Sequence, residues 1–271
     1  MNKGVAIAHS KINLGLIIGI KRPDGFHDLD SYFIRTSLAD YISYEIEECN
    51  ELTIFIDGND SYLEPGKMDL MEKAARFFSE ETGFVFSLRI SIEKHIPSQA
   101  GLGGGSSDAA SVIMFLGEHF KIDKEILLKI GERVGSDVPF FITGFTSARV
   151  KGRGEVIVES ELPLKRTILL IFPNSHVSTK DAFNRLDNMN REISTLPNSL
   201  EAINRATFRN DFELLLDGNV DKILNDIVDE DDYYSLSGSG STWFILTDGK
   251  RSGEYQKALD AYFKTCIAEI K

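Results

Sequence analysis

The sequence predicts an α+β protein with two lobes. Strand patterns and helix patterns alternate irregularly along its 271 residues, so neither a repeat architecture nor a regular series of βαβ units is favoured. Apolar residues alternate strictly over 84–93, which predicts a strand, and they recur at helical spacing over 109–120. Between the two lies a loop rich in glycine, over 99–108. The order is strand, glycine loop, helix.

The other elements follow from the same two periodicities. Strands are expected over 5–20, 42–46, 52–56 and 167–172. Helices are expected over 68–81 with Gly83 as the stop, from the N-cap Asp123 to Gly135, at several places between 180 and 228, and over 254–270. Two further strands should flank the glycine motif 237–241.

The composition excludes several classes of protein. A net charge of -12 argues against general binding to nucleic acid or to a membrane surface, because phosphate backbones require clustered Lys and Arg. The longest purely apolar run, 168–172, is too short to span a bilayer. Cys49 and Cys266 lie far apart and suit a reducing compartment. We therefore expect a cytoplasmic protein that acts on a small molecule, with its oligomeric state left open.

The glycine loop predicts a phosphate site. Glycines without Cβ atoms let the backbone approach a phosphate, and the first N–H groups of the following helix favour an anion. Ser106 and Ser107 are expected to cap this helix and to donate to phosphate. No Lys occurs in 100–111, which excludes a Walker A loop, and Ser106 stands where a dinucleotide fingerprint needs Gly. The alternative is a flexible surface loop.

Three segments together resemble the GHMP kinase family. Pro97 and the run 101–110 (GLGGGSSDAA) are similar to its phosphate-binding motif, 10–16 (SKINLGL) to its N-terminal motif, and 236–241 (LSGSGS) to its C-terminal glycine motif. The matched segments keep the order of the family from about residue 8 to 243. The resemblance implies an N-terminal mixed α/β lobe over 1–158, a ferredoxin-like α+β lobe over 159–271, and an active site in the cleft between them.

The resemblance also implies an activity. Within the family, 22–27 (RPDGFH), 135–141 (GSDVPFF) and 152–155 (GRGE) are most similar to members that act on a cytidine-linked polyol. We therefore expect ATP-dependent phosphorylation of the 2-hydroxyl of a diphosphocytidyl-linked methylerythritol, in the non-mevalonate route to isoprenoid precursors. Two alternatives stay open: a mevalonate- or homoserine-like kinase, and a catalytically inactive nucleotide-binding sensor. Mg²⁺ should accompany ATP; its ligands are undetermined, with Ser107 as a candidate.

Asp137 and Lys11 are the candidate catalytic residues. Asp137 is a carboxylate placed directly before the apolar run 138–141, and a charge there needs either a partner or a function. Lys11 lies on a strand that is otherwise mostly apolar. By themselves these residues could be a turn or N-cap Asp and a Lys at a strand edge. The resemblance matches Asp137 with the catalytic Asp of the family and implies that Lys11 keeps it ionised.

The resemblance also implies which residues bind the substrate. Asn13 should share a strand face with Lys11. Phe26 and Phe183 match two aromatic positions that sandwich the cytosine ring, although either alone would more often be a core residue. His27 matches the residue that reads the cytosine, and the Pro-Asp-Gly turn before it favours its exposure.

The nucleotide is assigned to the loop and to one lysine. Lys94 aligns with a family Lys near the nucleotide, with an exposed strand end as the alternative. Asp69 stands where the family often has an adenine-contacting Asn, and Phe26 where it usually has Tyr. The ATP-binding residues are expected to be Lys94, Gly101, Leu102, Gly103, Gly104, Gly105, Ser106 and Ser107.

Overall fold

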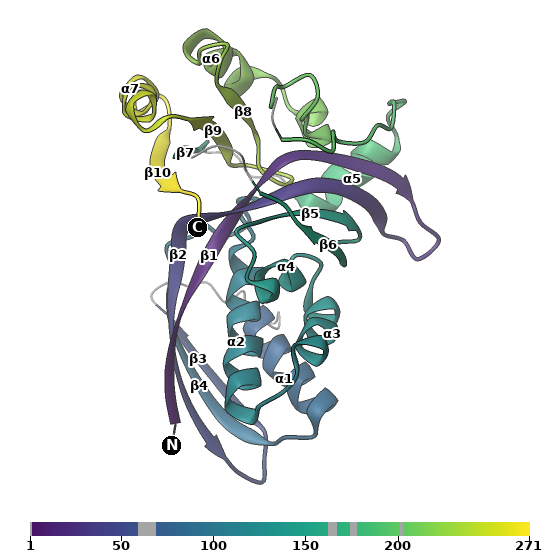
Figure 1. Ribbon diagram of the computed structural model, residues 1–271, viewed down its shortest axis with the longest axis vertical. Helices are drawn as coiled ribbons and strands as arrows, with labels where there is room; N and C mark the ends of the chain where they lie inside the picture. Colours follow the sequence, from purple (N-terminus) through teal and green to yellow (C-terminus); the bar gives the residue numbers. More distant parts are fainter. Residues whose placement is uncertain (1, 59–68, 162–166, 174–177, 201–202) are drawn as a thin grey trace. The chain divides into compact units, whose positions relative to one another are not determined.

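The structure is a computed structural model that describes residues 2–58, 69–161, 167–173, 178–200 and 203–271. The chain packs into two compact units (Figure 1). Unit 1 comprises Met1–Ser10, Leu38–Ser98 and Gly103–Phe145, and unit 2 comprises Lys11–Ser37, Gln99–Leu102 and Thr146–Lys271. Strands β1 (Asn2–Lys21) and β2 (His27–Glu48) each belong to both units. This division by packing differs from the predicted lobes 1–158 and 159–271, whose boundary remains a prediction.

Unit 1 combines a sheet with a group of helices. Its further strands are β3 (Thr53–Gly58) and β4 (Phe86–Glu93), and its helices are α1 (Leu70–Thr82), α2 (Gly104–Phe120), α3 (Lys124–Val134) and α4 (Val138–Thr143). Strand β4 pairs antiparallel with β2 and parallel with β3. The helices lie along one face of this sheet (Figure 1). Four apolar residues of β4 are buried, as its alternating pattern predicts: Phe86, Leu88, Ile90 and Ile92.

Helix ends in unit 1 test the capping predictions. Helix α1 ends at Gly83, which has a φ of 76°, as predicted. Its N-cap is Asp69, whose carboxylate accepts the Met71 N–H at 2.7 Å. Helix α2 begins at Gly104 after the N-cap Gly103, which has a φ of 70° and no side-chain cap. The prediction that Ser106 and Ser107 cap α2 is therefore wrong, because both lie inside its first turn.

Unit 2 holds the second sheet. Its elements are β5 (Ser147–Gly152), β6 (Val156–Glu159), β7 (Thr167–Phe172), α5 (Thr179–Asp187), the 3-10 helix η1 (Asp211–Leu215), α6 (Asn219–Ile227), β8 (Tyr233–Leu236), β9 (Trp243–Thr247), α7 (Gly249–Leu259) and β10 (Lys264–Glu269). The second sheet has the order β10-β7-β9-β8, with antiparallel pairs throughout. Strands β5 and β6 belong to the first sheet, in which β5 pairs with β2. Apart from η1 and α6, which are inserted between α5 and β8, the elements from β7 to β10 follow the βαββαβ order of a ferredoxin-like fold. This confirms the predicted fold class of the C-terminal part.

The end of the chain corrects one prediction. The single helix expected over 254–270 is wrong, because α7 ends at Leu259 and β10 follows it. Strand β10 pairs with β7, with Cys266 opposite Leu170. Short apolar segments do not identify strand or helix by themselves, and here a buried neighbouring strand supplies the hydrogen-bond partners.

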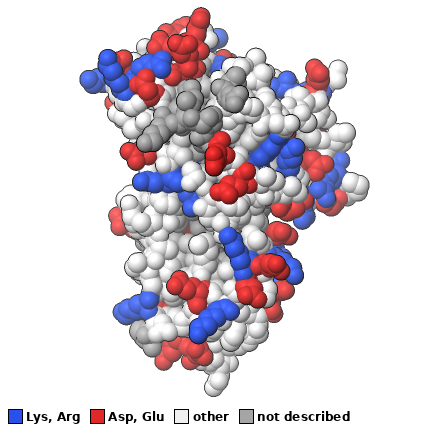
Figure 2. Space-filling view, in the orientation of Figure 1, with Lys and Arg blue, Asp and Glu red and all other residues white. Residues whose placement is uncertain are grey.

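Both positive and negative side chains are found on the surface. On the face shown in Figure 2, Lys and Arg side chains lie intermingled with Asp and Glu. Among the described residues, no helix is long and apolar enough to cross a membrane.

Candidate active site

The first half of the glycine loop packs within unit 2. A Cβ added to Gly101 would lie 2.1 Å from the carbonyl oxygen of Ser237, so only glycine fits there. The Ser237 hydroxyl donates to the Gly101 carbonyl at 2.9 Å, and the Thr242 N–H donates to the Ala100 carbonyl at 3.2 Å. The C-terminal glycine motif therefore holds the start of the phosphate loop in place.

Asn210 also supports the loop, although it was not among the residues predicted from the sequence. Its amide Nδ2 donates to the carbonyls of Leu236 and Gly238 at 2.8 and 2.9 Å, and its side chain is buried. An isolated Asn in a segment without clear periodicity gives no signal for such a role, since the carbonyls it binds are more than twenty positions away.

The second half of the loop opens helix α2 in unit 1. The first intrahelical bond runs from the Ser107 N–H to the Gly103 carbonyl at 2.9 Å, so the N–H groups of Gly104, Gly105 and Ser106 precede the ladder. Such groups at a helix N-terminus favour an anion. A Cβ on Gly104 would lie 2.9 Å from Cγ2 of the buried Ile96, so this glycine is also required for packing.

Lys11 and Asn13 share a face of β1, as predicted. Both side chains are buried, and Lys11 Nζ donates to Asn13 Oδ1 at 2.5 Å. The Lys11 ammonium also lies 4.5 Å from the centre of the Phe33 ring. Asn13 Nδ2 in turn donates to the Ser31 hydroxyl at 2.9 Å. Lys11 is therefore an oriented, buried cation and not a lysine that extends into solvent from a strand edge.

Asp137 occupies the N-cap position of α4 in unit 1, but its side chain makes no capping bond. The residue is half-buried and directly precedes the buried Val138 and Pro139. The alternative interpretation of Asp137 as a turn or N-cap residue therefore explains its backbone position. It does not give the carboxylate a role. Its catalytic role remains a prediction.

All four predicted substrate-binding residues lie in unit 2, and the three with aromatic rings make ring contacts there. The His27 ring stacks on Phe183 with 4.9 Å between centroids and 20° between planes, and Phe183 packs edge-on against Phe212 at 5.0 Å. Phe26 is 50% exposed, with the Arg153 guanidinium 5.1 Å from its ring centre. The structure thus places Phe183 and His27 together, and it gives Phe26 a cation as its stacking partner.

The prediction that His27 is exposed is wrong. Its side chain is only 7% exposed, because Phe183 covers the ring and Asp187 accepts from Nε2 at 2.6 Å. Asp187 lies one helical turn beyond Phe183 on α5, and Lys21 Nζ contacts its other oxygen at 3.2 Å. The bond to His27 holds the pKa of the Asp187 carboxyl below its ordinary value. The sequence analysis did not identify Asp187.

Lys94 is buried in unit 1 between two carboxylates. Its ammonium donates to Asp40 Oδ2 at 2.5 Å and to Asp108 Oδ2 at 2.6 Å. Its side chain is 4% exposed, so it is not the exposed strand end of the alternative interpretation. Asp69, the nearby N-cap of α1, has a pKa raised chiefly by burial.

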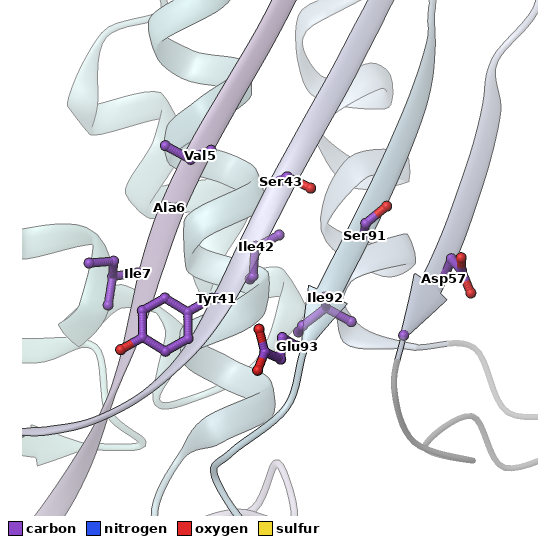
Figure 3. A pocket seen from close by; sticks show the side chains of 11 residues that line it. Val5, Ala6, Ile7, Tyr41, Ile42, Ser43, Asp57, Ser91, Ile92 and Glu93 are labelled. Atoms are coloured by element: carbon purple, nitrogen blue, oxygen red, sulfur yellow. The ribbon is translucent and has the colours of Figure 1, made fainter.

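A groove of about 800 Å³ lies elsewhere in unit 1 (Figure 3). It is lined by residues of β1, β2, β3 and β4, among them Ile7, Tyr41 and Ser91. None of the predicted site residues lines this groove.

Comparisons with known proteins agree with the motifs. The family model of the GHMP kinases N terminal domain matches residues 69–145. Curated relatives include the 4-diphosphocytidyl-2-C-methyl-D-erythritol kinases of Thermotoga maritima, 36% identical over 89% of this chain and 90% of that protein, and of Chlorobium chlorochromatii, 33% identical over 89% and 87%.

Solved structures give the same result. A crystal structure of 4-(cytidine 5'-diphospho)-2C-methyl-D-erythritol kinase is similar with a TM-score of 0.77 and 30% identity, covering 98% of both chains. The Methanococcus jannaschii mevalonate kinase shares the fold, with a TM-score of 0.72 at 15% identity over 100% and 99% of the two chains. The chain therefore belongs to the GHMP kinase family and is a phosphotransferase that acts on an alcohol group.

Proposed function

We propose that the protein transfers the γ-phosphoryl group of ATP to the 2-hydroxyl of 4-diphosphocytidyl-2-C-methyl-D-erythritol. The observation that carries this proposal is that relatives of that name match about nine-tenths of the chain at more than 30% identity. The buried Lys11–Asn13 pair and the His27–Phe183 stack support it, because the resemblance assigns Lys11 a catalytic role and the other three residues substrate-binding roles.

The reaction needs little covalent chemistry from the protein. The substrate hydroxyl oxygen forms a bond to the γ-phosphorus, the bond from that phosphorus to the β–γ bridging oxygen breaks, and ADP leaves. The hydroxyl proton passes to the carboxylate of Asp137. The ammonium of Lys11 offsets the negative charge that develops on the substrate oxygen and the moving phosphoryl group. The N–H groups of Gly104, Gly105 and Ser106 bind the phosphates.

Mg²⁺ bound together with ATP would neutralise part of the negative charge of the triphosphate. Mg²⁺ commonly takes one or two protein oxygens and completes its shell with phosphate and water, so it does not need a cluster of acidic ligands. Among the described residues, no three His, Cys, Asp or Glu side chains are grouped so that they could hold a metal ion. We assign Ser107, in the first turn of α2, as the protein oxygen that would hold it.

The cytidine end of the substrate would be bound by the aromatic residues of unit 2. Phe183 offers a ring held in place by Phe212, and His27 has its Nε2 engaged by Asp187. Phe26, which is half exposed, would cover the other side of the base.

A coupled assay of ADP release tests the proposal. The enzyme should show its highest kcat/KM with 4-diphosphocytidyl-2-C-methyl-D-erythritol, compared with mevalonate, homoserine and galactose. A preference for mevalonate or homoserine would assign the chain to another GHMP-type activity. ATP binding without turnover of any acceptor would indicate an inactive sensor.

A further inference from the structure

A cluster of three buried charged side chains lies behind the phosphate loop in unit 1. Lys94 donates to Asp40 at 2.5 Å and to Asp108 at 2.6 Å. The exposed fractions of the three side chains are 4%, 0% and 1%. Three charges buried this completely are costly unless each is well paired, so the cluster requires an explanation.

Asp40 ties the cluster to the segment before the loop. Its Oδ1 accepts from the backbone N–H groups of His95 and Ile96 at 2.6 and 2.8 Å, while Oδ2 accepts from Lys94. Ile96 is the residue that a Cβ on Gly104 would contact at 2.9 Å. Asp40 therefore fixes the backbone of the residue against which the first residue of α2 packs.

Asp108 ties the same cluster to helix α2. It lies one residue after the first turn, whose N–H groups precede the helical ladder. Its Oδ2 accepts from Lys94, whereas Oδ1 is buried and has no hydrogen-bond partner within the described part of the chain. A buried carboxylate with one unsatisfied oxygen is unfavourable as an anion. Burial accordingly raises the pKa of Asp108 to about 8, against the opposing effect of Lys94.

We propose that Asp40, Lys94 and Asp108 are positioning residues that hold the first turn of α2, with its free N–H groups, at the position that binds the ATP phosphates. Lys94 then acts through its two carboxylates instead of contacting the nucleotide. This inference rests on the proposed function only in taking that turn as the phosphate site.

The test measures ATP binding by calorimetry with no acceptor present, so that it does not depend on which acceptor the enzyme uses. Lys94→Met should weaken ATP binding about 10-fold or more, while kcat at saturating ATP stays within about 3-fold of wild type. Tyr44→Phe is the matched control, because it removes a buried hydroxyl between the same strand and the same helix. It should leave ATP binding within about 2-fold of wild type.

Asp40→Asn keeps the proposal testable if Lys94→Met does not fold. Its amide keeps the shape of the side chain, but it cannot accept from Lys94 and from the His95 and Ile96 N–H groups at the same time. This variant should weaken ATP binding about 5-fold or more. Equal ATP affinity in Lys94→Met and Tyr44→Phe, or wild-type ATP affinity in a folded Asp40→Asn, would overturn the proposal. Normal ATP binding by wild type without turnover of the cytidine-linked acceptor would instead refute the proposed function alone.

Discussion

Unit 1 and unit 2 each bury a lysine, and different contacts orient the two ammonium groups. Within unit 2, Lys11 contacts the amide oxygen of Asn13 and the ring of Phe33. Within unit 1, Lys94 contacts the carboxyl groups of Asp40 and Asp108. We propose that the charge of Lys94 holds the first turn of α2, whereas the charge of Lys11 acts on the substrate. Burial alone does not distinguish these two roles, because both side chains are almost fully buried.

Replacing Lys11 should have one of the largest effects on activity. It should also distinguish the role of Lys11 from that of Lys94. Lys11→Met removes a cation that offsets charge in the transition state, so kcat should fall by about 10²–10⁴-fold. ATP affinity should stay near wild type, in contrast to Lys94→Met. Steady-state kinetics together with calorimetry measure both quantities. A loss of ATP affinity in Lys11→Met with unchanged kcat would reverse the comparison.

Asp137 lies in the same unit as Lys94 and should nevertheless behave like Lys11. Asp137→Asn keeps the size of the side chain and removes the charge that accepts the hydroxyl proton, so kcat should fall by about 10²–10⁴-fold while both substrates bind. The double variant with Lys11→Met should be far less impaired than the product of the two single effects, because both residues serve one step. Near-normal turnover of a folded Asp137→Asn enzyme would make Asp137 a turn residue only.

An intermediate effect is expected at the aromatic contacts of unit 2. Stacking on a base contributes about 1–3 kcal/mol, so Phe183→Ala should raise the acceptor KM by roughly 5- to 150-fold. ATP affinity should hardly change. Because Phe183 also packs on Phe212, the unfolding temperature is measured in parallel. Equal losses of affinity for acceptor and ATP would identify Phe183 as a core residue.

The sequence predicts correctly those elements that depend on a pattern of neighbouring residues. The alternation of Phe86 to Ile92 predicts β4 with its buried face, and Gly83 marks the end of α1. Lys11 and Asn13 share a strand face because side chains on a strand alternate, which the spacing of two already implies. Strand β10 could not be predicted in this way, since its pairing with β7 joins residues about a hundred positions apart.

The partners of the candidate residues were not predictable for the same reason. Asp40 is 54 residues from Lys94, and Asp187 is 160 residues from His27. The turn before His27 indicates exposure, and only the packing of α5 reveals that its ring is covered. Motifs thus indicate candidate site residues, whereas the orientation of these residues depends on distant partners.

Asp187 gives a smaller and more specific prediction. A carboxylate only accepts hydrogen bonds, so Nε2 of His27 carries the proton and, in the neutral ring, Nδ1 is left as an acceptor. Asp187→Asn no longer fixes this tautomer, and the acceptor KM should rise roughly 10-fold. Lys21→Ala is the matched control, because it removes the contact to the other oxygen of Asp187 and leaves His27 in place. An equal rise in KM in both variants would mean that the ion pair, and not the tautomer, matters.

The smallest effect is expected in the pH dependence of stability, where the Lys94 cluster should differ from the rest of the molecule. Asp108 has an ordinary pKa of 3.8 and a folded-state pKa of about 8. Between these values the folded protein holds a proton that the unfolded chain has lost, so this residue makes stability fall as pH rises from 4 to 8. Asp108→Asn removes the contribution. The unfolding temperature of wild type should therefore drop between pH 5 and 8 by about 3 °C or more beyond the drop in the variant, as read by calorimetry. Parallel curves for the two proteins would show that Asp108 is ionised throughout this range, and Lys94 would then be held by two charged carboxylates at neutral pH.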